Sequence, residues 1–240
     1  MKTIVFYFLS QSRYNAFGNL TNDTHKPARR INLDPLRSFF EKLALSWDAS
    51  QPPDRDEILD RLVAPFHEAL NHRGSLLEVG TGTGALIPIL KQYCPDSRLV
   101  SIDLAGQMLV RAKMRACGAK LVQSDIHHLP FQPNSFNAVI CHNSFPHFWG
   151  KPEALLEIKR TLRPQGKVLV LHDLSRERVN DIHRNASNPI IHKDLLPEGY
   201  ELAQMLEMAG YQPLLVEDIE EHYVVYGELK NSKPDPRNIP

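Results

Sequence analysis

The chain has 240 residues, the length of one α/β domain with short extensions, and enough to bury a complete core. Lys plus Arg and Asp plus Glu both number 28, and this balance gives no electrostatic signature for nucleic acid or an anionic membrane. The three cysteines form neither a disulfide framework nor a CxxC metal site, so we expect reduced thiols in a cytoplasmic protein. No apolar run approaches the roughly 20 residues of a spanning helix, so we expect no stable membrane insertion.

Residues 1–34 mix aromatic, polar and basic side chains without a sustained period, and we expect a poorly ordered N-terminal extension. The apolar run from Ile4 to Leu9 is too short for a signal peptide, and no small-residue cleavage pattern follows it. Large apolar side chains then recur at helical spacing between Pro35 and Ser46 and predict a helix. Asp54 is expected to begin a second helix, which Pro65 should kink.

Short apolar runs alternate with helical patterns through the rest of the chain. Strands are predicted at residues 75–79, 98–102, 120–123, 137–142, 167–171, 212–217 and 222–228. Helices are predicted at about 84–93, 104–116, 152–162 and 197–209, with a turn at 163–166. Repeated βα units that end in a hairpin predict a mostly parallel sheet with helices on both faces. The domain therefore spans residues 35–229, with a polar insertion at 173–197 and a Pro-rich tail at 230–240 that we expect to be disordered.

A glycine-rich turn follows the first predicted strand and reads Glu78-Val79-Gly80-Thr81-Gly82-Thr83-Gly84. Glycines at such a turn let backbone N–H groups approach a ligand, with no side chain in the way. Glu78 lies near the carboxyl end of the strand, which is where ligands of open α/β sheets bind. A carboxylate there suits a hydroxylated or cationic ligand and would repel a pyrophosphate. The turn therefore indicates a nucleoside-type cofactor that carries positive charge.

Further side chains reach the same edge of the predicted sheet. Asp103 follows the second strand and can accept hydrogen bonds from both hydroxyls of a ribose. Asp125 follows the third strand and can accept from an exocyclic amine such as adenine N6, although it can also simply cap the following turn. Met108 and Ile126 can cover the two faces of a purine, although Met108 also fits a core position. The spacing Gly80-x-Gly82-x-x-Ala85 satisfies the looser dinucleotide fingerprint as well, so a nicotinamide cofactor stays open at this point.

Several segments, in order, resemble the motifs of class I S-adenosylmethionine-dependent methyltransferases. Glu78 to Gly84 matches the first motif, Ser101 to Leu109 is similar to the second, and Ser124 to Phe136 is similar to the third. The stretch from Leu162 to Lys167 resembles the turn before the fifth strand of that family. Phe40-x-x-x-Ala44-x-x-Trp47-Asp48 resembles the N-terminal helix that these enzymes fold over the methyl donor. The resemblance covers roughly residues 38–228 and is closest to the small-molecule branch that includes quinone-biosynthesis methyltransferases.

The resemblance implies a Rossmann-like, seven-stranded sheet whose last strand is antiparallel, with S-adenosylmethionine as the donor and S-adenosylhomocysteine as its product. Gly80, Gly82 and Gly84 would approach the methionine part of the donor, and Glu78 would orient its amino group. Further donor contacts are implied for Asp103 and Leu104 (ribose side), Met108 and Ile126 (adenine faces), Asp125 (N6) and the backbone around His142 (methionine side). Phe40 and Trp47 would form a lid, if they are not core residues, and Asn143 and His192 would face the acceptor.

Seven of the eleven histidines fall between His127 and His192, on the side where the acceptor is expected. Histidine has the right pKa for a base near neutral pH and is a common metal ligand. We expect His147, together with His172 or His183, to deprotonate or orient the acceptor, although contact with substrate or a structural role is open for each. These residues lack the HxH or HxxxH spacing of a ligand pair on one element, so no metal is expected.

The sequence thus predicts methyl transfer from S-adenosylmethionine to a small-molecule acceptor by in-line displacement. Two alternatives remain, a protein that binds the donor without catalysis and an NAD-dependent oxidoreductase, which Glu78 disfavours. No second domain large enough to grip nucleic acid or a folded protein is apparent. The identity of the acceptor, the methylated atom and the oligomeric state are not readable from these residues.

Overall fold

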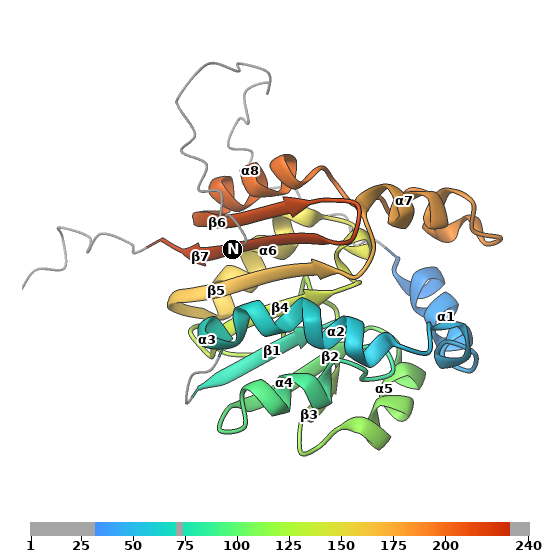
Figure 1. The fold of residues 1–240 in the computed structure, drawn as a ribbon, viewed down its shortest axis with the longest axis horizontal. Helices are drawn as coiled ribbons and strands as arrows, with labels where there is room; N and C mark the ends of the chain where they lie inside the picture. The colour runs from blue at the N-terminus through green and yellow to red at the C-terminus, as the bar shows by residue number, and fades with distance from the viewer. Residues whose placement is uncertain (1–31, 71–73, 231–240) are drawn as a thin grey trace, which may run out of the picture.

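A computed structural model describes residues 32–70 and 74–230 (Figure 1). The expected extension at 1–34, apart from its last three residues, and the expected tail, apart from Lys230, lie outside these residues. Among the described residues a single seven-stranded sheet has the order β3-β2-β1-β4-β5-β7-β6. The strands are β1 (Ser75–Val79), β2 (Arg98–Asp103), β3 (Lys120–Gln123), β4 (Phe136–His142), β5 (Leu162–His172), β6 (Tyr211–Asp218) and β7 (Tyr223–Leu229).

The strand directions confirm the predicted fold. The first five strands pair in parallel, whereas β7 runs antiparallel to both β5 and β6 and closes the sheet with the predicted hairpin. Since β1 lies between β2 and β4, the chain reverses its winding direction beside the carboxyl end of β1. That reversal leaves a crevice above the strand ends, which is where open α/β sheets bind ligands.

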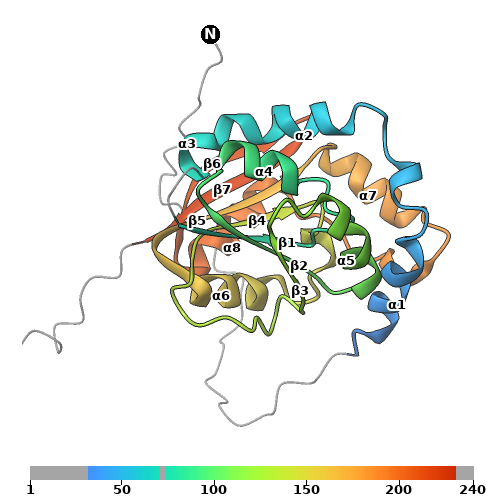
Figure 2. The same cartoon turned by 90° about the horizontal axis from the view of Figure 1, so that it is seen from below.

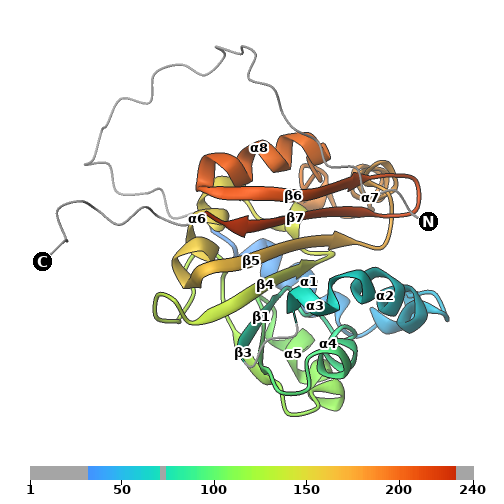
Figure 3. The same cartoon turned by 60° about the vertical axis from the view of Figure 1, so that its left-hand side comes forward.

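Helices cover both faces of the sheet, as Figure 2 shows. Helices α2, α3 and α4 lie on one face, and α6 and α8 lie on the other, with α8 running along β6 and β7 (Figure 3). The eight helices of the described residues are α1 (Asp34–Leu43), α2 (Arg55–Val63), α3 (His67–Leu70), α4 (Ile87–Tyr93), α5 (Gly106–Ala112), α6 (Lys151–Thr161), α7 (Arg176–Arg184) and α8 (Gly199–Ala209).

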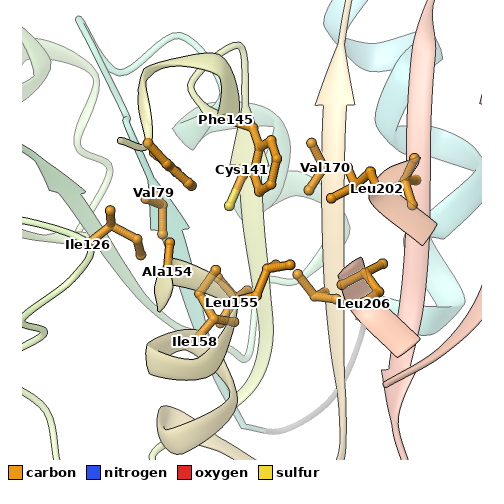
Figure 4. Close-up of a cluster of buried hydrophobic side chains, with 14 of the residues drawn as sticks. Val79, Ile126, Cys141, Phe145, Ala154, Leu155, Ile158, Val170, Leu202 and Leu206 are labelled. Carbon is orange, nitrogen blue, oxygen red and sulfur yellow. The ribbon is translucent and has the colours of Figure 1, made fainter. Parts of the chain in front are cut away.

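The core has two parts because side chains of a strand alternate between the faces of the sheet. On one face Val170 packs against Leu155 of α6 and Leu202 of α8 in the cluster of Figure 4. On the other face Leu76 and Ile140 belong to a second cluster, which includes side chains of α2 and α4. Strands that are buried on both faces consist of continuous apolar runs, and for this reason their positions could be predicted from the sequence.

Most boundaries differ from the sequence predictions by one to three residues, and four segments differ in kind or by more. The helix after the glycine turn begins at Ile87 instead of 84, because residues up to 86 remain in turns, and the helix expected at 104–116 is α5 followed by a 3-10 turn. The predicted turn at 163–166 lies within β5, as an irregularity in which Gln165 has a φ of 63°. The kink expected at Pro65 is a 3-10 turn between α2 and α3.

Candidate functional site

A cavity of about 780 Å³, part of it open to solvent, lies at the carboxyl ends of β1, β2 and β4. Its walls come from the glycine turn, the ends of the strands, the loop after β4 and helix α1. Eleven of the residues expected at the site line it, namely Phe40, Trp47, Gly80, Gly82, Asp103, Leu104, Met108, Asp125, Ile126, Asn143 and His147. The others, Glu78, Gly84, His142, His172, His183 and His192, lie outside its lining.

The three glycines of the turn have different surroundings, although all have positive φ angles. A Cβ on Gly80 would lie 2.3 Å from Cβ of Ser144, so glycine here lets the loop after β4 pack tightly on the turn. A Cβ on Gly84 would meet Ala112 of α5 at 3.0 Å. A Cβ on Gly82 would come within 4 Å only of Nε1 of Trp47, at 3.9 Å. Gly82 is therefore the glycine that leaves a cradle open to the cavity.

Asp103 ties the glycine turn to the end of β2. Its Oδ2 accepts a hydrogen bond from the backbone N–H of Gly82 at 2.8 Å, and its Oδ1 accepts from Ala105 at 2.9 Å. The residue is only 9% exposed, and burial raises the pKa of its carboxyl to about 6. Because an ionised carboxylate offers about four lone-pair sites, Asp103 can still accept hydrogen bonds from hydroxyls of a ligand.

Asp125 is held by His127, a residue that the sequence analysis missed. The backbone N–H of His127 donates to Oδ1 of Asp125 at 3.0 Å, and Nδ1 of His127 lies 2.8 Å from the same oxygen. Burial acts to raise the pKa of Asp125, but these contacts outweigh it and the pKa falls below its ordinary value. The ring of His127 stacks on Trp149 with a centroid distance of 4.1 Å, and both line the cavity. The Asp-x-His spacing was the only sequence signal for this arrangement.

Met108 and Ile126 are 2% and 6% exposed, so they combine core packing with a position in the cavity wall. Met108 forms a small cluster with Ala44 and Ala105, against which Phe40 and Trp47 pack. The two sequence interpretations of Met108, core residue and ligand contact, are therefore compatible.

Glu78 lies beneath the turn. Its Oε2 accepts hydrogen bonds from the hydroxyls of Thr81 at 2.9 Å and Ser101 at 2.6 Å, and the residue is 1% exposed. Burial outweighs these hydrogen bonds and raises the pKa of its carboxyl to about 7, with a smaller contribution from Asp103. Glu78 braces the turn from the side that faces away from the cavity, and its contact with a donor amino group stays a prediction.

Helix α1 and the segment after it cover the cavity, and polar contacts fasten them. The carboxylate of Glu41 accepts hydrogen bonds from the backbone N–H groups of Gly106 and Gln107 at 2.8 and 2.7 Å. Asp48 accepts from the Thr83 hydroxyl at 2.6 Å, and pairs with Arg55 at 3.1 Å and with Arg115 at 3.0 Å. We call this group, Asp48 with Thr83, Arg55 and Arg115, the latch. It joins the covering segment to the glycine turn directly.

Removing the latch should weaken donor binding. Hydrogen bonds to charged groups contribute about 1.5–3 kcal/mol each, and Asp48 is partly exposed, so we expect Asp48→Ala to lower the affinity for S-adenosylhomocysteine about 10-fold. Isothermal titration calorimetry measures this change. The matched control is Asp34→Ala, which removes the exposed pair with Arg37 on the same covering segment and should leave the affinity unchanged. Equal affinities of the Asp48 and Asp34 variants would refute a role for the latch.

Of the four histidines expected on the acceptor side, one lines the cavity and three lie outside its lining. His147 lines the cavity, and its Nδ1 lies 2.9 Å from Oδ2 of Asp194. His172 is fully buried, and burial together with neighbouring histidines holds its pKa well below the usual value. His183 contacts the backbone carbonyl of Asp194 through Nδ1, and burial lowers its pKa. His192 contacts the carbonyl of Ala186 through Nε2 at 2.8 Å.

His142, expected on the methionine side of the donor, ends β4 with its Nε2 buried and without a hydrogen-bond partner among the described residues. Within residues 32–70 and 74–230, no group of three or more His, Cys, Asp or Glu side chains is arranged to hold a metal ion. In the same part of the chain, none of the helices combines the length and the apolar character needed to cross a bilayer.

Comparison with known sequences finds similarity over the central part of the chain. Residues 77–170 match the family described as "Methyltransferase domain". A demethylmenaquinone methyltransferase of Thermotoga maritima is 30% identical over 96 residues, which is 40% of this chain and 42% of that protein. A malonyl-[acyl-carrier protein] O-methyltransferase of Halorhodospira halophila is 29% identical over 189 residues, 72% of this chain and 63% of that protein. The chain thus spans less than two thirds of the length of these relatives.

Solved structures show the same fold. A SAM-dependent methyltransferase from Aquifex aeolicus superposes with a TM-score of 0.62 at 19% identity, over 80% of this chain and 98% of that one. The magnesium protoporphyrin IX methyltransferase of Synechocystis, solved with bound S-adenosylhomocysteine, gives a TM-score of 0.61 at 12% identity, over 82% and 99% of the two chains. At these identities the likeness concerns the fold.

Proposed function

We propose, from the premise that the chain belongs to the class I S-adenosylmethionine-dependent methyltransferases, that it transfers a methyl group from S-adenosylmethionine to a small-molecule acceptor. The observation that carries this proposal is the contact between Asp103 and Gly82 at 2.8 Å, which brings a ribose acceptor and an open backbone cradle together in one cavity. The apolar rings of Phe40 and Phe148 beside His147 favour an acceptor with a substantial apolar part.

The residues of the cavity fit this donor. Bound S-adenosylmethionine supplies a methyl group on a positively charged sulfur, which is a good leaving group. The carboxylate of Asp103 suits the ribose hydroxyls, and the Oδ2 of Asp125, which His127 leaves free, suits the adenine amine. Met108 and Ile126 offer apolar surfaces for the adenine ring. The absence of a side chain at Gly82 leaves room for the methionine part.

The protein's contribution to the reaction is alignment, exclusion of water and removal of a proton from the acceptor. Alignment of the reacting atoms in a covered cavity can lower the barrier by several kcal/mol. Of the three histidines expected to act on the acceptor, only His147 lines the cavity, so we assign the acceptor-side base to His147. His172 and His183 lie behind it as supporting residues. The insertion at 173–197 carries α7 and lies at the same end of the sheet as α1, and we propose that it roofs the acceptor side (Figures 1 and 2).

Ligand-induced thermal shift tests the donor assignment. S-adenosylhomocysteine should raise the melting temperature by several degrees, because a ligand that binds only the folded state stabilises it. NAD, the cofactor of the less favoured oxidoreductase alternative, should leave it unchanged. A shift with NAD and none with S-adenosylhomocysteine would refute the proposal.

A second experiment separates catalysis from binding alone. Cell extract incubated with the protein and methyl-labelled donor should yield a labelled small molecule that mass spectrometry identifies. Donor binding without any labelled product would favour the alternative of a binding protein. We further propose a cytoplasmic location, which the three free cysteines support.

A further inference from the structure

We propose that Asp194 is a positioning residue that holds His147 in the tautomer with a proton on Nδ1 and a free lone pair on Nε2. Asp194 lies 47 positions after His147 in the chain, within the insertion that follows β5. The inference rests on the proposed function of His147 as the acceptor-side base, and it names the partner that such a base requires.

The contact between the two residues is short and shielded. Nδ1 of His147 lies 2.9 Å from Oδ2 of Asp194, and the side chains are 16% and 22% exposed. A carboxylate oxygen only accepts hydrogen bonds, so the hydrogen of this contact must sit on Nδ1. The lone pair of a neutral ring then lies on Nε2, the nitrogen that Asp194 leaves available.

Ring packing fixes the orientation of the imidazole. The ring of Phe40, from α1, meets His147 edge to face with a centroid distance of 4.9 Å. The ring of His183, from α7, lies at the same distance on a tilted plane. These neighbours restrict rotation of the His147 ring, and Asp194 selects which nitrogen carries the hydrogen.

The backbone around Asp194 is anchored as well. Its N–H donates to the carbonyl of Ile191 at 3.0 Å, and its own carbonyl contacts Nδ1 of His183. The Nζ of Lys151 donates to the carbonyls of Pro146 and Phe148 at 2.9 and 3.3 Å, which steadies the turn that bears His147. Both members of the pair are therefore held by groups outside the pair.

The arrangement accounts for every atom of the transfer to an acceptor X–H. The proton of X–H passes to Nε2 of His147 while the electron pair of X forms the bond to the methyl carbon. The pair of the breaking sulfur–carbon bond stays on sulfur, which becomes a neutral thioether. His147 becomes an imidazolium, whose Nδ1–H remains hydrogen-bonded to Asp194. It later releases the Nε2 proton to solvent. Asp194 orients and stabilises this cation without itself taking up the proton.

Nitrogen-15 NMR of the imidazole tests the inference without any acceptor, because the shifts of the two ring nitrogens report which one carries the hydrogen. At a pH high enough that the ring signals no longer change with pH, wild-type His147 should show a protonated Nδ1 and a bare Nε2. Asp194→Ala should convert this to a mixture of both tautomers. The control Asp181→Ala removes an exposed carboxylate on α7 and should leave the His147 signals unchanged.

If Asp194→Ala does not fold, Asp194→Asn replaces it, since its amide can donate to Nδ1 as well as accept from it and therefore no longer imposes the Nδ1–H tautomer. A folded Asp194 variant in which His147 keeps the wild-type tautomer would overturn the inference. Affinity for S-adenosylhomocysteine is measured on the same samples and should change by no more than about twofold, because Asp194 does not line the cavity. If the wild type does not bind S-adenosylhomocysteine, the proposed function is refuted. The role of Asp194 is tested separately, by the tautomer of His147.

Discussion

Asp103→Ala should weaken the binding of S-adenosylhomocysteine by at least about 100-fold, since two hydrogen bonds to a charged group contribute about 3 kcal/mol or more. The loss has two physical sources. The ligand loses the carboxylate proposed for its ribose hydroxyls, and the backbone N–H groups of Gly82 and Ala105 lose their acceptor. Calorimetric titration at a pH of about 8 measures the change, because burial raises the pKa of Asp103 to about 6 and the group is ionised above it.

Asp103→Asn serves as the matched control for shape. The amide oxygen can still accept from one of the two backbone donors, but the amide nitrogen cannot accept from a hydroxyl. We therefore expect an affinity between those of the wild type and the Ala variant. Wild-type affinity in Asp103→Ala, with the protein folded, would remove Asp103 from the donor site.

Glu78→Gln should change how stability depends on pH. Folded Glu78 keeps its proton up to a pKa of about 7, whereas the unfolded chain loses it near the ordinary value of 4.5. Between these values the folded state binds more protons than the unfolded state, so the free energy of unfolding falls as the pH rises. The whole of this loss is reached above about pH 7. The shift corresponds to about 3 kcal/mol, since one pKa unit is about 1.4 kcal/mol. Gln carries no charge and should remove this slope.

Chemical denaturation of wild type and Glu78→Gln at acidic and mildly basic pH measures the difference. Between pH 4.5 and pH 8, the free energy of unfolding of the variant minus that of the wild type should rise by about 3 kcal/mol, whatever its value at a single pH. Asp103, whose pKa burial also raises, adds a slope of the same sign that both proteins share. The control Glu68→Gln changes an exposed glutamate of α3 and should follow the wild-type curve. If the free energy of unfolding depends on pH in the same way for all three proteins, burial does not raise the pKa of Glu78.

Most of the fold could be predicted because local pattern and tertiary structure agree. The apolar runs at β1 and β4 are continuous since both faces of those strands are buried. The late start of α4 could not be predicted, because the turn at residues 82–86 ends in the same apolar pattern as the helix that follows it. The irregularity at Gln165 lies where the register between β5 and β4 shifts, between the pairs Phe136–Leu162 and Ala138–Lys167, and this register is a tertiary feature.

The site was predictable where topology alone brings residues together. The acidic residues Asp103 and Asp125 follow adjacent parallel strands, so they had to reach one edge of the sheet. The contact of His147 with Asp194 could not be predicted in this way, because it joins the loop after β4 to the insertion after β5, and strand topology fixes neither. Glu78, expected to contact the donor, lies outside the cavity lining, because alternation along β1 directs its neighbour Val79 toward the cavity.

The latch has a consequence for how ligands enter and leave the cavity. Helix α1 and its extension are held by charged groups, whereas the surface they cover is largely apolar. Added salt screens exposed ion pairs and strengthens apolar burial, so the two kinds of contact respond in opposite directions. Because the latch is the contact that salt weakens, the rate at which ligand leaves the cavity should rise with ionic strength.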